Sequence, residues 1–596
     1  MEGDGRRNSH GPLFSRKAES AGDDVVAGAP RAAQESRLSM TLGRHPLRSF
    51  SHSRFVAQIC LALAALLIAA GCERTSPRPS ADSFPILTPP TPLAPRINGS
   101  RIFGVRPGSP FRYQLPATGG RPLAFAADNL PAGLTIDGDS GIITGGLENE
   151  GRYHVRLRVS NRLGRAEKSF TIVVGEEIAL TPPMGWNSWN CWGEKVSEAR
   201  VRAAARALVA TGLRDHGWTY VNIDDGWQGR RAGPWQAIQP NPKFTDLPRL
   251  SREIHDLGLK LGIYSSPWKA TFARHIGSSA DNVDGSIDLP PEMKEFRYEQ
   301  PRLHSRLEKF FLFKPLAEWQ RERARKEFHK RLHSFGKTSF VRQDVQQWAA
   351  WKVDYLKYDW VPIDLPHVIE MSRELRNANR DIVYSLSNNA KLPLAPELAK
   401  WANAWRTTVD IADTWESVSD LGFSRDKWAP FNRAGHYNDP DMLVIGRTRW
   451  SPPEGSRLNS DEQYSHMSLW CLLSGPLLLG CDLERLDPFT LGLLTNDEVL
   501  AVNQDPLSRQ ATRVTRSGAG QVYAKQLEDG TWAVGLFNRG PQPAIVAVRW
   551  SDLGLTSAQT VRDLWRQKDF GVFNERFETR VNPHGVVLIR IAPQAR

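Results

Sequence analysis

The stretch DYLKYDW, residues 354–360, decides the fold of this chain more than any other. Lys357 and Asp359 alternate there with apolar and aromatic residues, the period-two pattern of a strand whose charged side chains share one face. Further along, WRTTVD, residues 405–410, closes on another acid, Asp410. The two stretches predict strands of one sheet that each deliver a carboxylate at the strand end.

Strands of this kind recur through the middle of the chain and alternate with helix-length amphipathic segments. Eight strands are predicted, near 183–189, 220–225, 260–266, 355–359, 381–387, 404–410, 441–446 and 476–482. This alternation predicts parallel βα units, and eight of them indicate a closed (β/α)8 TIM barrel over residues 180–510. Polar residues gather at the predicted strand ends, where such barrels carry their active sites: Trp189, Asp224, Asp225, Tyr264, Asp359, Ser387, Asp410 and Asp482.

The parts of the chain on either side of the barrel have other patterns. Residues 73–92 are rich in proline, which lacks an amide donor, and predict a stiff linker. Short alternating strands between turn residues predict an Ig-like or cadherin-like β-sandwich over residues 93–177, interpreted as a spacer, with carbohydrate binding as the alternative. The same pattern predicts a C-terminal antiparallel β-sandwich over residues 511–596. The predicted fold class is therefore multidomain, a TIM barrel between two β-sandwiches.

Residues 1–72 are interpreted as an N-terminal extension and an export signal. FVAQICLALAALLIAA, residues 55–70, carries no charge, follows several arginines and is short for a membrane span of about 20 residues. The Ala-Ala-Gly-Cys sequence after it resembles a bacterial lipoprotein cleavage site, which implies lipidation of Cys72 and a periplasmic or cell-surface location. Plain secretion and a retained membrane helix are the alternatives, and Met40 is an alternative start of translation.

Composition limits the classes of partner. The net charge of +12 would suit a nucleic-acid binder, but 20 Trp residues suit the faces of sugars better. We therefore expect a carbohydrate partner, no nucleic acid, and membrane contact by the lipid anchor only. The five cysteines form no readable disulfide framework, and buried free thiols are the favoured interpretation.

Two acids from separate strands of one barrel supply the groups that cleavage of a glycosidic bond requires. In a retaining glycoside hydrolase one carboxylate attacks the anomeric carbon and a second protonates the departing oxygen, about 5–5.5 Å away. We expect Asp359 and Asp410 to face each other across a dry pocket, with the Lys357 ammonium keeping Asp359 ionised. Asp410 has to stay protonated, and Arg406, four residues earlier on the same predicted strand, works against that requirement.

Two other classes of protein remain as alternatives. A metal-dependent barrel enzyme also uses strand-end carboxylates and a lysine, but the adjacent pair Asp224 and Asp225 is a poor arrangement for a cation. A non-catalytic sugar-binding lipoprotein is the second alternative. The favoured interpretation, a hydrolase, needs no metal and no cofactor.

Eight motifs resemble, in order, those of glycoside hydrolase family 27, the α-galactosidase and α-N-acetylgalactosaminidase group of clan D. They are TPPMGWNSWN (181–190), YVNIDDGWQ (220–228), LGLKLGIYSSP (257–267), YLKYDW (355–360), WRTTVDIADTWESV (405–418), YNDPDMLVIG (437–446), DEQYSHMSLWCLLSGPLLLGCDL (461–483) and LLTNDEVLAVNQDPL (493–507). The family has a barrel followed by a β-sandwich. The resemblance therefore implies the same architecture that the residue patterns predict.

The resemblance also implies roles for individual residues. It implies an exo-acting enzyme that releases terminal α-linked galactose by double displacement with retention, with Asp359 as nucleophile and Asp410 as acid/base. The implied sugar contacts are Asp224 and Asp225 at the 6- and 4-hydroxyls, Lys357 near the 3- and 4-hydroxyls, Arg406 near the 2-position, and Trp189 and Tyr264 as aromatic lining.

Two departures of the chain from the family pattern bear on its substrate. Ser387 and Ala390 stand where many α-galactosidases carry larger residues, and similar small residues in α-N-acetylgalactosaminidases leave room for an acetamido group. α-N-Acetylgalactosaminidase activity is therefore an alternative to α-galactosidase activity. β-L-Arabinopyranosidase activity is another, because arabinopyranose shares the ring stereochemistry of galactose. The second departure is an insertion over about residues 268–345, of which 291–340 hold 13 Lys or Arg and 7 Asp or Glu. We interpret it either as a solvated helical elaboration or as a wall of the site that meets acidic glycans.

Overall fold

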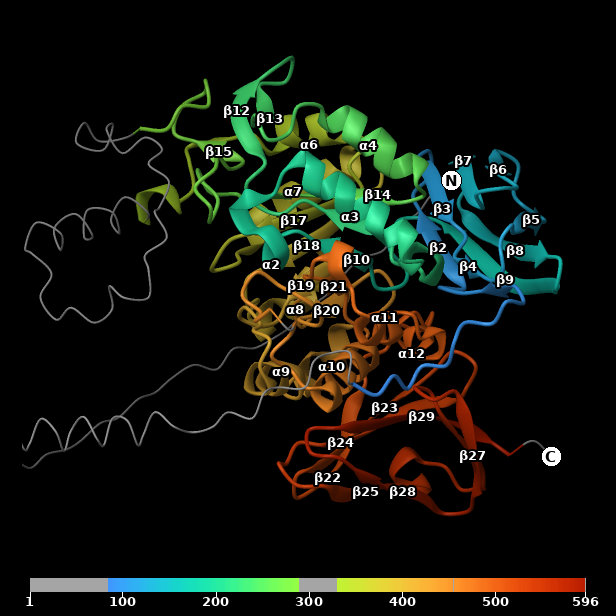
Figure 1. Ribbon diagram of the computed structural model, residues 1–596. Coiled ribbons are helices and arrows are strands. Elements are labelled where there is room, and N and C mark those ends of the chain that lie inside the picture. The colour runs from blue at the N-terminus through green and yellow to red at the C-terminus, as the bar shows by residue number, and fades with distance from the viewer. Residues whose placement is uncertain (1–83, 289–329, 454, 595–596) are drawn as a thin grey trace, which may run out of the picture. The chain divides into compact units, whose positions relative to one another are not determined.

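The computed structural model describes residues 84–288, 330–453 and 455–594, and it confirms the predicted multidomain fold class (Figure 1). Cys72, the export segment, most of the proline-rich linker and the middle of the insertion lie outside the described residues. Among the residues described, no helix has the length and apolarity that crossing a membrane requires.

The first domain is a sandwich of two sheets. One sheet has the order β2-β9-β8-β5 and the other β3-β7-β6; the strands are β2 (Ile102–Val105), β3 (Pro110–Gln114), β5 (Ala124–Asp128), β6 (Leu134–Ile136), β7 (Ile142–Gly146), β8 (Gly151–Asn161) and β9 (Gly164–Val174). Phe111, Leu157 and Ile172 are buried in its core. One pair in this domain is parallel, that of β2 with β9.

The central domain is a barrel of eight parallel strands. They are β10 (Met184–Asn187), β11 (Tyr220–Asn222), β14 (Lys260–Ser265), β17 (Tyr355–Asp359), β18 (Val383–Ser387), β19 (Ala404–Arg406), β20 (Tyr437–Asp439) and β21 (Leu477–Leu479). The ladder runs from β20 through β17 to β10 and β21. A single parallel bridge between Leu443 and Leu479 closes the ring, where the Leu443 amide donates to the Leu478 carbonyl at 2.9 Å.

Two predicted strands are corrected by the structure. The seventh strand is β20, which precedes the predicted segment 441–446, because Pro440 has no amide donor and Asp441 adopts a left-handed φ of 84°. The sixth strand, β19, ends at Arg406. Asp410 therefore lies in the loop after the strand and not on the strand itself.

Helices pack around the barrel and their ends carry recognisable signals. Asp246 caps α4 (Leu247–Asp256) through the Arg249 amide, and Asn459 with Glu462 forms a capping box on α10 (Ser460–Leu473). The other long helices are α3 (Glu198–Ala210), α6 (Val341–Ala350), α7 (Leu365–Asn377) and α9 (Trp415–Gly422). Helix α10 is buried over almost its entire length. Such a helix has to be covered on every side.

The cover of α10 comes partly from the C-terminal domain. A six-stranded antiparallel sheet and a separate pair, β25 with β28, form this domain; its strands are β22 (Thr512–Ser517), β23 (Gly520–Gln526), β24 (Trp532–Asn538), β25 (Ala544–Arg549), β26 (Gln559–Asp563), β27 (Lys568–Phe573), β28 (Arg576–Val581) and β29 (Val586–Pro593). Tyr523 and Phe537 belong to the same hydrophobic cluster as Trp470 of α10. The sandwich therefore shares its core with the barrel.

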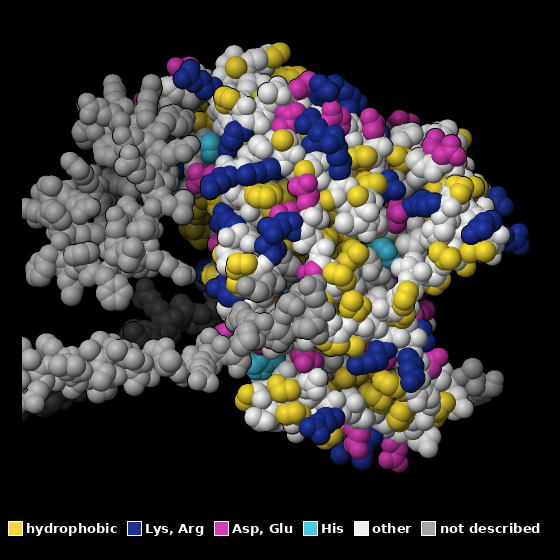
Figure 2. Space-filling model, in the orientation of Figure 1, with side chains coloured by type: hydrophobic (Ala, Val, Ile, Leu, Met, Phe, Trp, Pro, Cys, Tyr) yellow, Lys and Arg dark blue, Asp and Glu magenta, His cyan; other side chains and the backbone are white. Residues whose placement is uncertain are grey.

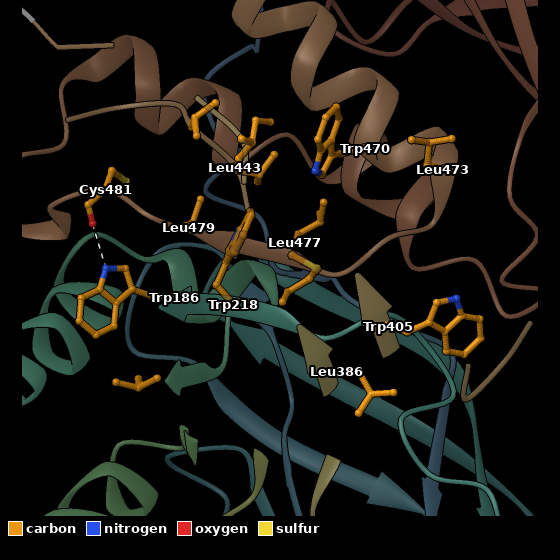
Figure 3. Close-up of a cluster of buried hydrophobic side chains, with 14 of the residues drawn as sticks. Trp186, Trp218, Leu386, Trp405, Leu443, Trp470, Leu473, Leu477, Leu479 and Cys481 are labelled. Carbon is orange, nitrogen blue, oxygen red and sulfur yellow. Dashed lines mark hydrogen bonds between the residues drawn. The ribbon is translucent and has the colours of Figure 1, made fainter. Parts of the chain in front are cut away.

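Leucine and aromatic side chains make up much of this shared core (Figure 3). Trp186 is fully buried and donates its indole N–H to the Cys481 carbonyl at 2.9 Å. Cys191, Cys471 and Cys481 are buried free thiols, which confirms the prediction for these three cysteines.

On the face shown in Figure 2, Lys and Arg side chains are mixed with Asp and Glu and form no single basic patch.

Candidate active site

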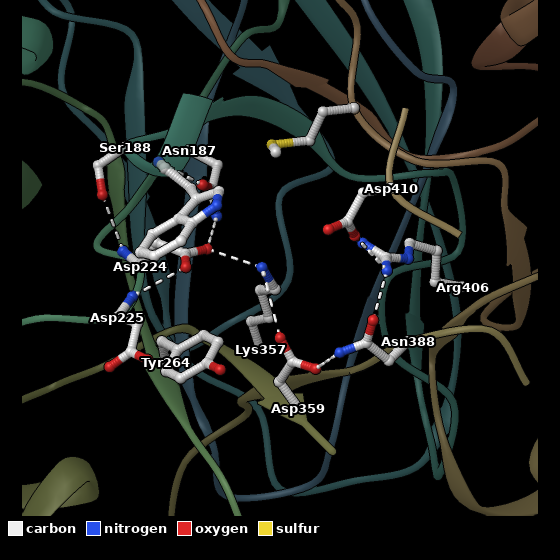
Figure 4. A network of polar contacts seen from close by, with 12 residues as sticks. Asn187, Ser188, Asp224, Asp225, Tyr264, Lys357, Asp359, Asn388, Arg406 and Asp410 are labelled. Atoms are coloured by element: carbon white, nitrogen blue, oxygen red, sulfur yellow. Dashed lines mark hydrogen bonds and ion pairs between the residues drawn. The ribbon is translucent and has the colours of Figure 1, made fainter. Parts of the chain in front are cut away.

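The strand ends of the barrel bring most of the predicted site residues into one cluster (Figure 4). Strands β14 and β17 pair with Tyr264 opposite Lys357, and β17 and β18 pair with Asp359 opposite Ser387. Because partners in a parallel register point to the same face, each pair presents both side chains to the same face of the sheet. Asp224 and Asp225 follow β11 on the other side of Tyr264.

Lys357 makes its closest contact with Asp224. Its ammonium nitrogen lies 2.9 Å from Asp224 Oδ2 and 3.9 Å from Asp359 Oδ2. Asn187 donates to the same Asp224 oxygen at 2.8 Å. Burial alone would lower the pKa of Lys357, but the carboxylates of Asp224 and Asp359 outweigh burial and hold this pKa above its ordinary value. The lysine is therefore a fixed cation between two acids.

Asp359 is a buried carboxylate at the end of β17, with 8% of its side chain exposed. Burial raises the pKa of Asp359, while Lys357, Arg406 and a hydrogen bond with Tyr264 act in the opposite direction. Lys357 therefore favours the ionised form of Asp359 together with Arg406 and Tyr264, against the larger effect of desolvation. A carboxylate in this state is poorly solvated, and poor solvation favours attack on an electrophile.

Asp410 is not in the dry setting that was expected. Its side chain is 82% exposed, and its Oδ1 lies 2.6 Å from Arg406 Nη2. The reason is the early end of β19, after which the loop carries Asp410 outward while Arg406 stays buried in the barrel. Figure 4 shows the carboxyl groups of Asp410 and Asp359 directed toward the same central opening. The Asp410 carboxyl is therefore exposed to solvent, whereas the Asp359 carboxyl is buried.

Asn388 joins the two sides, and the sequence interpretation missed it. Its Nδ2 donates to Asp359 Oδ1, and its Oδ1 accepts from Arg406 Nη2 at 2.7 Å. Asn388 follows β18 with a left-handed φ of 76°, a conformation that asparagine tolerates better than most residues. The pair of asparagines in YSLSNNA was the available signal, since it indicates a tight turn at a strand end.

Asp225 has one oxygen without a partner. Its Oδ2 accepts from the Ala273 amide at 2.7 Å, whereas its Oδ1 is buried and makes no hydrogen bond within the described structure. Burial raises the pKa of Asp225 to about 7, and the nearby charges of Asp224 and Asp359 add to the effect. An unpaired buried oxygen of this kind is costly, so the position is suited to a polar group of a ligand.

Trp189 is held beside these acids by Asn187, a second residue that the sequence interpretation missed. The Trp189 amide donates to Asn187 Oδ1 at 2.9 Å, and the opposite end of the same amide side chain contacts Asp224. The Arg449 guanidinium lies over the Trp189 ring at 4.9 Å from the centroid. The indole is thus connected through Asn187 to the acidic pair.

Ser387 and Ala390 flank Asn388 and are both buried. Ser387 ends β18 beside Asp359, and the Ala390 amide donates to the Arg406 carbonyl at 2.8 Å. The two small residues therefore occupy the Asp359–Arg406 side of the site, where the resemblance places the 2-position of the sugar.

Asp439 and Asp441 hold the backbone at the rim of the barrel through hydrogen bonds. Asp439 Oδ1 accepts from the Asp441 amide at 2.8 Å, and Asp441 Oδ2 accepts from the Ile411 amide at 2.9 Å. The second bond fixes the residue that follows Asp410. Nowhere in ranges 84–288, 330–453 and 455–594 do three His, Cys, Asp or Glu side chains gather as metal ligands.

Comparisons with known proteins match all three domains. The family described as "Alpha galactosidase A" matches residues 181–288 and 332–505, "Alpha galactosidase C-terminal beta sandwich domain" matches 517–591, and "Putative Ig domain" matches 94–175. A "Probable alpha-galactosidase" of Dictyostelium discoideum is 32% identical over 70% of this chain and 94% of its own length. An "Alpha-N-acetylgalactosaminidase" of Gallus gallus is 27% identical over 70% of this chain and 95% of its own length.

Solved structures give the same picture. A "putative alpha-galactosidase" from Bacteroides fragilis superposes with a TM-score of 0.69 at 29% identity, covering 84% of this chain and 98% of its own. A β-L-arabinopyranosidase from Geobacillus stearothermophilus, solved in complex with arabinose, has a TM-score of 0.56 at 26% identity and covers 70% of this chain and 98% of its own.

Proposed function

We propose, from the premise that this chain belongs to the α-galactosidase family of glycoside hydrolases, family 27, that it is a retaining α-galactosidase. It acts on the ends of oligosaccharides or glycans and releases terminal α-linked galactose. One observation carries the proposal: the buried carboxylate of Asp359 is connected through Asn388 and Arg406 to the exposed carboxylate of Asp410.

The two carboxylates suit the two halves of a double displacement. Asp359 attacks the anomeric carbon while Asp410 gives its proton to the departing glycosidic oxygen, which leaves galactose bonded to Asp359 through an ester. Asp410 then takes a proton from a water molecule, whose oxygen attacks the same carbon and releases galactose with its original anomeric configuration. The exposure of Asp410 supports its role, because it has to meet both leaving groups and water.

The acidic pair supports selectivity for galactose. Asp224 already accepts from Lys357, Asn187 and the Asp225 amide, so its carboxylate is fixed in place. Asp225 Oδ1 is the buried acceptor still open to a sugar hydroxyl. An epimer that cannot reach this oxygen leaves it unpaired, which costs about 1–3 kcal/mol.

Product configuration tests the mechanism directly. Proton NMR of the reaction with p-nitrophenyl α-galactoside should show α-galactose as the first product, and β-galactose appearing first would contradict retention.

Azide distinguishes the roles of the two acids when each is replaced in turn. Asp359→Gly with azide should give β-galactosyl azide by direct displacement, whereas Asp410→Gly with azide should give α-galactosyl azide from the ester intermediate. Identical products from the two variants would contradict the assignment.

Ser387 and Ala390 favour a second candidate, α-N-acetylgalactosaminidase activity. Both residues are small and buried beside Asp359 and Arg406. The relative from Gallus gallus carries that name, and the Geobacillus neighbour is a β-L-arabinopyranosidase of the same family. Rates with p-nitrophenyl α-galactoside, α-N-acetylgalactosaminide and β-L-arabinopyranoside decide among the three. We expect the highest kcat/KM with the galactoside, and turnover of the acetamido sugar alone would reverse that choice.

The enzyme is also proposed to act outside the cytoplasm as a lipoprotein. The support is the apolar segment 55–70 and the Cys72 that follows it. Cys72→Ser should move the protein from the membrane fraction to the soluble fraction of cells. Retention of the variant in the membrane fraction would contradict lipid anchoring.

A further inference from the structure

We infer that Asn388 is a positioning residue that holds the proposed nucleophile Asp359 and the guanidinium of Arg406 in a fixed relation to each other. The inference rests on the proposed function, and it adds to the site a residue that belongs to none of the motifs shared with the family. Its basis is a pair of side-chain hydrogen bonds seen in Figure 4.

The chemistry of the two bonds requires a carboxamide. Asn388 meets a carboxylate at one end, to which its Nδ2 donates, and a guanidinium at the other, from which its Oδ1 accepts. A carboxylate at this position would present acceptors to both neighbours and would repel Asp359. A hydroxyl or a methyl group is too short to reach both. Asparagine is therefore matched to an anion on one side and a cation on the other.

The backbone around Asn388 keeps the amide in place. Its φ of 76° is left-handed, and the φ of Asn389 is 50°. One residue further on, the Ala390 amide donates to the Arg406 carbonyl at 2.8 Å. On the other side, Ser387 is still paired within β18. The turn is thus tied to β18 and to β19 within three residues, and Asn388 has little freedom to turn away.

The contact with Asn388 differentiates the two oxygens of Asp359. Oδ1 accepts from the amide, whereas Oδ2 lies 3.9 Å from the Lys357 ammonium, beyond hydrogen-bond distance. Oδ1 is therefore the oxygen that Asn388 holds in place. A nucleophile held in one orientation needs less reorganisation to reach the transition state.

The second contact extends to Asp410. Arg406 Nη2 is shared between Asn388 Oδ1 and Asp410 Oδ1, at 2.7 and 2.6 Å. Arg406 is further fixed by its Nε, which donates to the Thr408 carbonyl at 3.1 Å. Loss of the Asn388 acceptor leaves Arg406 with one partner fewer on the side that faces the nucleophile.

Asn388 also favours the ionised form of Asp359, because an N–H that donates to a carboxylate stabilises its charge. Burial acts against that ionised form, and the other groups that face Asp359 act in both directions. Lys357 and Arg406 favour the charged form and Asp224 disfavours it. Among the described residues, the groups that face Asp359 include Lys357 of β17, Tyr264 of β14, Arg406 of β19, Asp224 and Asp225 after β11, and Asn388 after β18.

Two variants test the inference while keeping the left-handed backbone. Asn388→Gly removes both hydrogen bonds, and Asn388→Asp keeps the size but replaces the donor with an acceptor. With p-nitrophenyl α-galactoside we expect kcat/KM to fall about 10- to 100-fold for the glycine variant and further for the aspartate variant. The acid limb of kcat/KM against pH should move upward by about one pH unit in both, since Asp359 then ionises less readily.

Asn389 supplies the matched control. It has the same residue type and the same backbone region, but no hydrogen bond joins its side chain to Asp359 or Arg406 within the described structure. Asn389→Gly and Asn389→Asp should therefore keep the wild-type acid limb. A purely structural turn would give similar losses at 388 and 389, with the acid limb unmoved at both, and would overturn the inference.

The proposed function and the inference fail in different ways. A wild-type protein inactive on all three p-nitrophenyl glycosides contradicts the proposed function. The inference is then judged from crystal structures of wild-type protein and Asn388→Gly, in which the side chains of Asp359 and Arg406 should differ in orientation or order. Superimposable side chains in the two crystals contradict the inference whether or not the protein is active.

Discussion

The ammonium of Lys357 is hydrogen-bonded to Asp224, at 2.9 Å, and lies a full ångström further from Asp359. The lysine that was expected to keep Asp359 ionised therefore has Asp224, the acid proposed to contact the sugar, as its first partner. Because Asp224 is fixed by Lys357 while Lys357 remains within Coulombic range of Asp359, one cation couples these two carboxylates.

Lys357→Met should impair both the reaction at Asp359 and the contact of Asp224 with the sugar. Loss of the cation removes an effect that lowers the pKa of Asp359, so this pKa rises further and the acid limb of kcat/KM moves to higher pH. Asp224 also becomes a buried carboxylate without its cation. We expect kcat/KM to fall about 100-fold or more. Steady-state kinetics from pH 4 to 8 provide the measurement.

Lys400→Met is the control, because Lys400 is an exposed lysine that pairs with Glu397 on α8 (Ala395–Trp401). It should leave both the rate and the pH profile unchanged. An unshifted acid limb in Lys357→Met would contradict the electrostatic role of Lys357.

Asp225→Asn should change how stability depends on pH. Burial raises the pKa of Asp225 to about 7, so the folded protein binds this proton more tightly than the unfolded chain does. The resulting stabilisation is complete below the ordinary pKa near 4 and is lost as the pH rises through about 7. The asparagine variant does not titrate. The difference in free energy of unfolding between the variant and the wild type should therefore shift in favour of the variant between pH 4 and 8, by a few kcal/mol at most.

Urea denaturation at pH 5 and pH 8 measures this difference. Asp569→Asn, a substitution at an exposed carboxylate, is the control and should show no gain relative to wild type. If the free energies of unfolding of Asp225→Asn and wild type differ by the same amount at both pH values, Asp225 does not titrate in this range.

Asn187→Asp should weaken sugar binding. The substitution removes the donor to Asp224 Oδ2 and sets a second carboxylate against it, while the acceptor for the Trp189 amide remains. A buried acceptor that loses its donor costs about 1–3 kcal/mol, so we expect kcat/KM to fall about 10- to 100-fold, mainly through KM. Asn379→Asp, at an exposed loop position, serves as the control. A fall confined to kcat would contradict a role in binding.

Asp441 should tolerate asparagine better than alanine. Its φ is 84°, where alanine is strained by about 1–2 kcal/mol and asparagine is tolerated. Asparagine also keeps an oxygen for the Ile411 amide. The free energy of unfolding should therefore drop more in Asp441→Ala than in Asp441→Asn, as measured by urea titration. Equal losses would show that neither the backbone nor the Ile411 contact matters to stability.

Sequence reasoning succeeded where a pattern is local. Strand β17 was predicted at the bounds the structure gives, because charged and apolar residues alternate along its whole length. Strand β20 was misplaced, because three residues cannot show a periodicity and the apolar run 442–445 after them looks more like a strand. The charged residues at strand ends were predicted as a group, since the carboxyl ends of parallel strands meet at one rim.

The remaining features of the site depend on distances between remote segments. Nothing near Asn388 in the sequence shows that Asp359 and Arg406 lie on either side of it, and asparagine in a turn is commonplace. Asn187 was missed for the same reason. The exposure of Asp410 follows from the point at which β19 ends, and that point is set by pairing with β20, not by the residues of WRTTVD themselves.

The insertion between β14 and β17 begins and ends at a short antiparallel pair, β15 (Ser279–Ala280) with β16 (Thr338–Ser339). The family match stops at residue 288 and resumes at 332, just inside this pair. The pair joins the two ends of the added segment. The length and composition of this segment can therefore vary without displacing the strands that carry Tyr264 and Lys357. The pair is therefore a permissive insertion site beside the candidate active site, at which a protein engineer can exchange one appended segment for another.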